Sequence, residues 1–117
     1  MRNRVVVTGL GCITPLGNDV SSSWENCING NSGIEKITNF NPEMYRCQIA
    51  GEVKNFLLPE IIPLKEAKKM DLFIKYSIGA TQEALEDSGL EITKEIEEEV
   101  GVSMGVGIGG LGCIEKY

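Results

Sequence analysis

Two short apolar runs, each leading into glycine, constrain the fold of this chain more than any other feature. The first is RVVVT at positions 4–8, which ends at Gly9, and the second spans 100–106 and continues into GIGGLG at 107–112. Short runs of this kind, bounded by glycine, are typical of strands buried on both faces of a parallel sheet. A helical pattern separates the two runs, and the order strand, helix, strand predicts an α/β fold.

A long helix is predicted between these runs, over residues 64–88. Its apolar residues recur at steps of three and four and so share one stripe: Ala67, Met70, Ile74, Ile78, Thr81 and Leu85. Gly89 should end the helix in the left-handed conformation. Leu72, Phe73 and Tyr76 lie outside the stripe, so this helix needs cover on more than one side. The rest of the chain offers little cover, and we expect a further layer or a partner subunit.

The remaining elements have shorter patterns. In chain order we expect a helix over 23–29, capped through the Ser22 and Glu25 spacing and stopped by Gly30, a loop over 32–45, a strand over 48–53, an acidic helix over 93–99 and a helix beginning near 111. No cap or breaker follows residue 111, so we expect the last helix to continue beyond Tyr117.

Composition excludes several classes of function. The chain has 117 residues, which fits one domain or part of one, and its net charge of −6 argues against nucleic acid as a partner. A domain of this size buries roughly two-thirds of its surface. No apolar run approaches the ~20 residues that cross a bilayer, and the first residues lack a secretory signal. We therefore expect a cytoplasmic protein that does not enter membranes.

The chain contains no histidine and four cysteines, Cys12, Cys27, Cys47 and Cys113. The cysteines form no CxxC pair, so a zinc site would need all four scattered thiolates. We expect four small buried hydrophobes instead, with no metal and no cofactor. Cys113 follows a glycine turn at a possible helix start, where the pKa of a thiol can fall. Without histidine as an activating base, we do not expect it to be a nucleophile.

The glycine turns have two possible interpretations. Gly105, Gly107 and Gly110 match the GxGxxG spacing that lets a backbone approach a pyrophosphate. The match is incomplete, because the predicted strand overlaps it and no acidic residue follows ~20 positions later. Close packing of backbones explains these turns better, as it does for Gly9 and Gly11, and it does not exclude a binding role.

Three lysines, Lys65, Lys68 and Lys69, fall in the first turns of the predicted long helix. The macrodipole is positive there, so exposed cations cost about 0.3–1 kcal/mol each. Such a cluster in an acidic chain suggests an anionic partner, either a phosphate group or an acidic protein surface. A solvated helix start is the alternative, and the spacing does not decide between them.

Five stretches occur in the order found in one family: RVVVTGLGCITPLGN at 4–18, SGI at 32–34, KKMDLFIKY at 68–76, EALEDSGL at 83–90 and GVGIGGLG at 105–112. They resemble the β-ketoacyl-[acyl carrier protein] synthases, most closely the type II enzymes of fatty acid synthesis among the thiolase-like condensing enzymes. The resemblance implies an α/β fold of layers αβαβα and a homodimer. Residues 1–117 would be only part of the N-terminal half.

The resemblance also implies a reaction. A cysteine accepts an acyl group from acyl carrier protein, two histidines support decarboxylation of malonyl-carrier, and the carbanion attacks the thioester to extend the chain by two carbons. In this family those residues lie downstream of the segment seen here, so the chain should hold no catalytic residue and no cofactor.

What the resemblance assigns to this chain is binding. Lys65, Lys68 and Lys69 match the basic helix start that docks the acidic, phosphopantetheine-bearing acyl carrier protein. Gly107 and Ile108 match the turn that gates the fatty-acyl pocket. The alternative is a non-catalytic piece that binds the carrier protein or serves in assembly.

Overall fold

The computed structural model describes residues 2–116. In chain order its elements are α1 (Val20–Ile28), β1 (Ile34–Lys36), β2 (Ile49–Gly51), α2 (Leu64–Ala67), α3 (Leu72–Ser88), the 3-10 turn η1 (Glu97–Glu99) and α4 (Leu111–Ile114). β1 and β2 pair antiparallel, with Ile34 opposite Gly51. The predicted strand at 48–53 is therefore confirmed, whereas the loop predicted over 32–45 contains β1. None of the helices in this part of the chain is long and apolar enough to cross a membrane.

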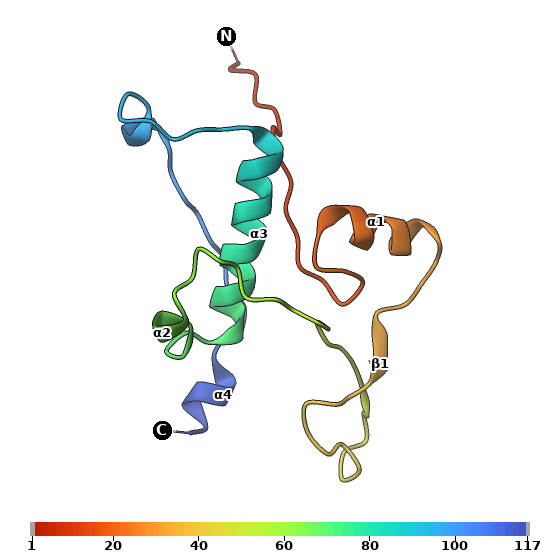
Figure 1. Cartoon of the computed structure of the whole chain (residues 1–117). Helices are drawn as coiled ribbons and strands as arrows, with labels where there is room; N and C mark the ends of the chain where they lie inside the picture. The colour runs from red at the N-terminus through yellow and green to blue at the C-terminus, as the bar shows by residue number, and fades with distance from the viewer. Residues whose placement is uncertain (1, 117) are drawn as a thin grey trace.

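α3 is the central element, and the other segments lie around it (Figure 1). Its N-cap is Asp71, whose carboxylate accepts the Leu72 N–H at 2.7 Å. Gly89 ends it at φ 64°, in the left-handed region that glycine adopts without strain. The predicted stop at Gly89 is confirmed.

The prediction of one helix over 64–88 is wrong. The chain forms α2 and then leaves helical geometry before α3, with Asp71 extended at φ −74° and ψ 164°. Aspartate is a favoured N-cap because its carboxylate satisfies a helix N–H that has no carbonyl partner. The apolar stripe continues across this break, so periodicity alone did not reveal it.

α1 also begins differently from the prediction. It starts at Val20 because Asp19, not Ser22, is the N-cap, and the Asp19 carboxylate accepts the Ser22 N–H at 2.7 Å. Hydrogen bonds from Ser22 lower the pKa of Asp19. The end of the helix agrees with the prediction, with Asn29 as C-cap and Gly30 at φ 70°.

The N-terminal segment lies directly against α3. A Cβ at Gly11 would overlap the carbonyl oxygen of Ala80, and one at Gly9 would overlap that of Ala84. This confirms close packing as the role of the first glycine turn. Glu83 strengthens the contact, since its carboxylate accepts the N–H groups of residues 12 and 20 at 2.9 and 2.7 Å.

The two apolar runs, at residues 4–8 and 100–106, do not form strands in the described part of the chain, residues 2–116. Val5 is 90% exposed and Val102 is 80% exposed. Thr8, at the end of the first run, and residues 100–104 of the second line one groove on α3, together with Ala80 and Ala84, without joining in a sheet. A strand that is apolar on both faces needs hydrogen-bonding neighbours and covering layers, and the described residues supply neither. The strand predictions are wrong for this part of the chain.

The molecule exposes far more surface than its size requires. Its accessible area is 10069 Å², against about 6,300 Å² for a compact protein of this mass. The radius of gyration is 17.3 Å, against about 13 Å for a compact domain of this length. Among the described residues, the buried hydrophobic core consists of Ile62 and Ala67, which are still 5% and 6% exposed. The expected burial of two-thirds of the surface is therefore wrong.

Candidate functional site

The three lysines are exposed and lie on and just after α2. Lys65 is in the last turn of α2, Lys68 is its C-cap, and the Lys69 Nζ lies 3.4 Å from a carboxylate oxygen of Glu66. The lysines therefore do not lie within the first turns of a long helix, and the prediction that placed them there is wrong. What remains is an exposed basic cluster in which, among residues 2–116, Lys65 and Lys68 form no ion pair.

The turn that carries Gly107 and Ile108 projects from the molecule. Ile108 is 81% exposed, and among residues 2–116 no heavy atom beyond the adjacent residues lies within 4 Å of where a Cβ on Gly107 would be. The next residue does have contacts, because a Cβ on Gly109 would lie 2.9 Å from the ring of Phe73. Gly110 adopts φ 80° and starts α4. The turn is thus supported on one side, by the start of α3.

A second contact joins this turn to the start of α3. The Asp71 Oδ2 is buried and lies 3.4 Å from where a Cβ on Gly110 would be. A hydrogen bond to Asp71, with a smaller desolvation effect, raises the pKa of the Cys113 thiol. A helix start usually lowers the pKa of a thiol. A raised pKa favours the thiol over the thiolate, in agreement with the expectation that Cys113 is not a nucleophile.

The other cysteines are also free. Cys12 is half-buried, while Cys27, Cys47 and Cys113 are exposed, so the prediction that all four are buried is wrong. The cause is the open packing of the whole molecule rather than a special role for sulfur. Within residues 2–116 no three metal-ligating side chains gather into a cluster.

The two predicted sites lie at one end of α3. α2 and α4 both lie near its N-terminal end (Figure 1), and the chain runs from Lys69 to Phe73 through Asp71. The structure therefore brings the basic cluster and the Ile108 turn to the same region. Sequence reasoning assigned no role to Phe73 or Asp71, and only the unexplained apolar position of Phe73 outside the helix stripe could have indicated one.

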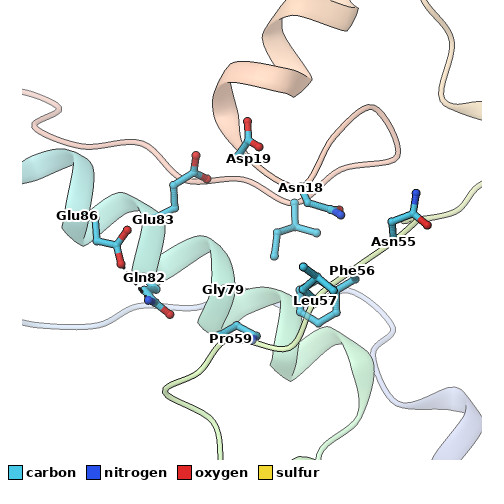
Figure 2. Close-up of a pocket in the computed structure, with 11 residues that line it drawn as sticks. Asn18, Asp19, Asn55, Phe56, Leu57, Pro59, Gly79, Gln82, Glu83 and Glu86 are labelled. Atoms are coloured by element: carbon cyan, nitrogen blue, oxygen red, sulfur yellow. Dashed lines mark hydrogen bonds between the residues drawn. The ribbon is translucent and has the colours of Figure 1, made fainter.

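A cavity of ≈ 350 Å³, lined by both polar and apolar side chains, lies elsewhere, beside α3 from Gly79 to Glu86 (Figure 2). Asn18, Phe56 and Glu86 line it, together with Glu83. None of the predicted binding residues reaches it, and Glu83 is engaged with backbone N–H groups. This cavity is a consequence of how the N-terminal loop is held on α3.

Comparison with known proteins identifies the family. The family model "Beta-ketoacyl synthase, N-terminal domain" matches residues 2–116. The chain is 51% identical over 114 residues to 3-oxoacyl-[acyl-carrier-protein] synthase 2 of Vibrio harveyi, covering 97% of this chain and 28% of that protein. The protein of the same name from Staphylococcus aureus strain COL is 46% identical over 112 residues, covering 96% and 27%.

A solved structure, the ishigamide ketosynthase/chain length factor, matches with a TM-score of 0.67 and 32% sequence identity, over 78% of this chain and 23% of that one. The chain therefore belongs to the β-ketoacyl synthase family, in the region of its N-terminal domain. The α/β, thiolase-like fold class predicted from the sequence is confirmed. The chain spans just over a quarter of the length of these curated relatives.

Proposed function

We propose that this chain forms the carrier-docking and acyl-gating part of a condensing acyltransferase of fatty acid synthesis. The complete enzyme extends an acyl chain by two carbons from malonyl-acyl carrier protein, through an acyl-cysteine, and acts as a cytoplasmic homodimer. Residues 1–117 are part of its ketoacyl synthase domain. One observation carries the proposal: in a member of this family, the exposed basic cluster and the Ile108 turn lie at the same end of α3.

The chemistry of the two parts is complementary. Exposed ammonium groups attract an acidic carrier protein over distances of about 8–10 Å at physiological salt. Ile108 stands beyond Gly107, at the tip of a turn that meets no other residue on its outer side. An isoleucine in that position can move to admit an alkyl chain. The docking surface thus delivers the acyl group beside the residue that admits it.

Charge reversal tests the docking surface. In the full-length protein, Lys65→Glu and Lys68→Glu should each weaken binding of acyl carrier protein by about tenfold, because an attractive charge becomes a repulsive one. Lys94→Glu is the matched control, since Lys94 is exposed and follows the opposite end of α3. Equal losses in all three variants would contradict a specific dock.

Condensation itself is tested with malonyl-carrier and an acyl primer. The full-length protein should form the β-ketoacyl product and release CO₂. The 117-residue chain alone should not, because it contains no histidine to support decarboxylation. Decarboxylation by the isolated chain would overturn the assignment of this segment to docking and gating.

A further inference from the structure

We propose that Phe73 is a positioning residue that sets the place of Ile108, and through it the acyl-chain selectivity of the enzyme. The inference rests on the proposed function. It adds to the gate a supporting side chain on α3 that the family resemblance does not assign.

The support comes from one side only. A Cβ on Gly109 would lie 2.9 Å from the Phe73 ring and 2.8 Å from Val106 Cγ1. Gly109 is therefore held between the ring and the preceding turn residue. Gly107 has no such neighbour, and Ile108 is 81% exposed. The position of Ile108 is thus set through Gly109.

Glycine is required at this contact for a steric reason. Any side chain on Gly109 would meet the Phe73 ring below ordinary van der Waals distance, so the turn would have to move away from α3. The ring itself is fixed at the first turn of a helix of 17 residues. Gly110, at φ 80°, and the side chain of Asp71 beside it complete the support. A rigid helix start therefore carries a projecting turn.

Removing the ring should release the turn. In the full-length enzyme, Phe73→Ala leaves a space into which residues 106–110 can settle, so Ile108 no longer holds one position. The ratio of kcat/KM for a twelve-carbon to a two-carbon primer should shift by about fivefold toward the value of Ile108→Ala. One methylene of pocket space discriminates substrates by about tenfold, so a change of this size is measurable.

A double-mutant cycle separates positioning from general loss of packing. In an Ile108→Ala background, Phe73→Ala should leave the ratio unchanged, because the side chain it positions is absent. Phe56→Ala is the matched control: Phe56 packs edge-to-face on Tyr76 of α3, with ring centroids 4.8 Å apart. It should lower Tm without altering the ratio. Phe73→Leu, which keeps part of the contact, should give an intermediate ratio and serves if Phe73→Ala does not fold.

The outcomes divide clearly. Suppose that the wild-type enzyme condenses normally and that Phe73→Ala or Phe73→Leu keeps the wild-type ratio of kcat/KM values. That result would overturn this inference and leave the proposed function standing. Additive effects of the Phe73 and Ile108 substitutions would also overturn it. A wild-type enzyme that condenses no primer would overturn the proposed function first, and this inference with it.

Discussion

The Glu83 carboxylate accepts the backbone N–H of Cys12 at 2.9 Å, across 71 positions of sequence. The same carboxylate accepts the N–H of Val20 at 2.7 Å, and Asp87, one turn later, accepts that of Leu10 at 2.9 Å. Two acidic side chains on one face of α3 thus hold the N-terminal segment by its backbone. This contact gives the first prediction.

Glu83→Gln should weaken the hold on this segment. Hydrogen bonds to a charged group contribute about 1.5–3 kcal/mol, and the amide of glutamine retains only one acceptor oxygen. We expect residues 10–20 of the full-length protein to exchange their amide hydrogens at least about tenfold faster, which corresponds to about 1.4 kcal/mol. Glu86→Gln is the control, because within the described part of the chain the Glu86 carboxylate accepts a hydrogen bond only from the Gln82 side chain, at 2.9 Å. Unchanged exchange in Glu83→Gln would contradict the assigned role.

Gly11→Ala should destabilise the protein by about 3 kcal/mol, because the new methyl group overlaps the Ala80 carbonyl oxygen and forces the segment off α3. Urea unfolding followed by fluorescence measures this loss. Gly101→Ala provides the comparison, since no non-adjacent residue of the described chain comes within 4 Å of its Cβ position. If the two variants unfold at the same urea concentration, the close approach of Gly11 to α3 is wrong.

Asp71→Asn tests the contact between α3 and α4. Asp71 raises the pKa of Cys113, so less thiolate is present near pH 8 than in a thiol of ordinary pKa. Removing the negative charge should lower this pKa and speed alkylation of Cys113 by iodoacetamide at pH 8. Asparagine is as good an N-cap as aspartate, so α3 should remain intact.

Peptide mapping by mass spectrometry measures the reaction at each cysteine, and Cys27, which is exposed on α1, is the internal reference. The faster alkylation in Asp71→Asn should disappear at a pH well above the pKa of Cys113, because Cys113 is then ionised in both proteins. An identical alkylation rate at pH 8 would show that Asp71 and Cys113 are not in contact.

Ile108→Phe should narrow the acyl gate. A bulkier side chain at the tip of the turn leaves less room for an alkyl chain, so activity on long primers should fall more than activity on acetyl, by about tenfold in the ratio. Steady-state kinetics of the full-length enzyme with primers of graded length measures this. Equal losses across all lengths would contradict a gating role for Ile108.

The isolated chain of 117 residues should associate in solution or precipitate. It exposes 10069 Å², including Val5, Val7 and Val102, at 78–90% of their full exposure. Contiguous apolar surface of this kind drives association. Sedimentation velocity at several concentrations measures it, and a monodisperse monomer with a cooperative melt would be the contrary result.

The sequence predicted the elements whose signals are local. The end of α3 at Gly89 follows from the left-handed conformation that glycine adopts, and β2 follows from a short apolar run. The break between α2 and α3 was missed because the apolar stripe continues from Met70 to Ile74, on either side of Asp71. The capping spacing of Asp19 was overlooked in favour of Ser22, although both are cap formers.

Local sequence patterns could not predict the contacts between residues distant in sequence. Glu83 and Asp87 have the spacing of an ordinary solvated helix face, and nothing near them indicates that they hold residues 10–20. The contact of Phe73 with Gly109 likewise joins residues distant in sequence. The three lysines are exposed, but the dipole argument made for them depended on a helix that begins later than predicted.

The break before Asp71 has a consequence for engineering the enzyme. Because Lys65, Lys68 and Lys69 precede the cap of α3, their charges can be rewritten without altering the cap or the dipole of the helix that supports the turn. Recognition of the carrier protein and selection of the acyl chain could then be changed independently of each other. If the lysines dock the carrier and Ile108 gates the acyl chain as proposed, the enzyme could be retargeted to a carrier of different charge while keeping its preferred product length.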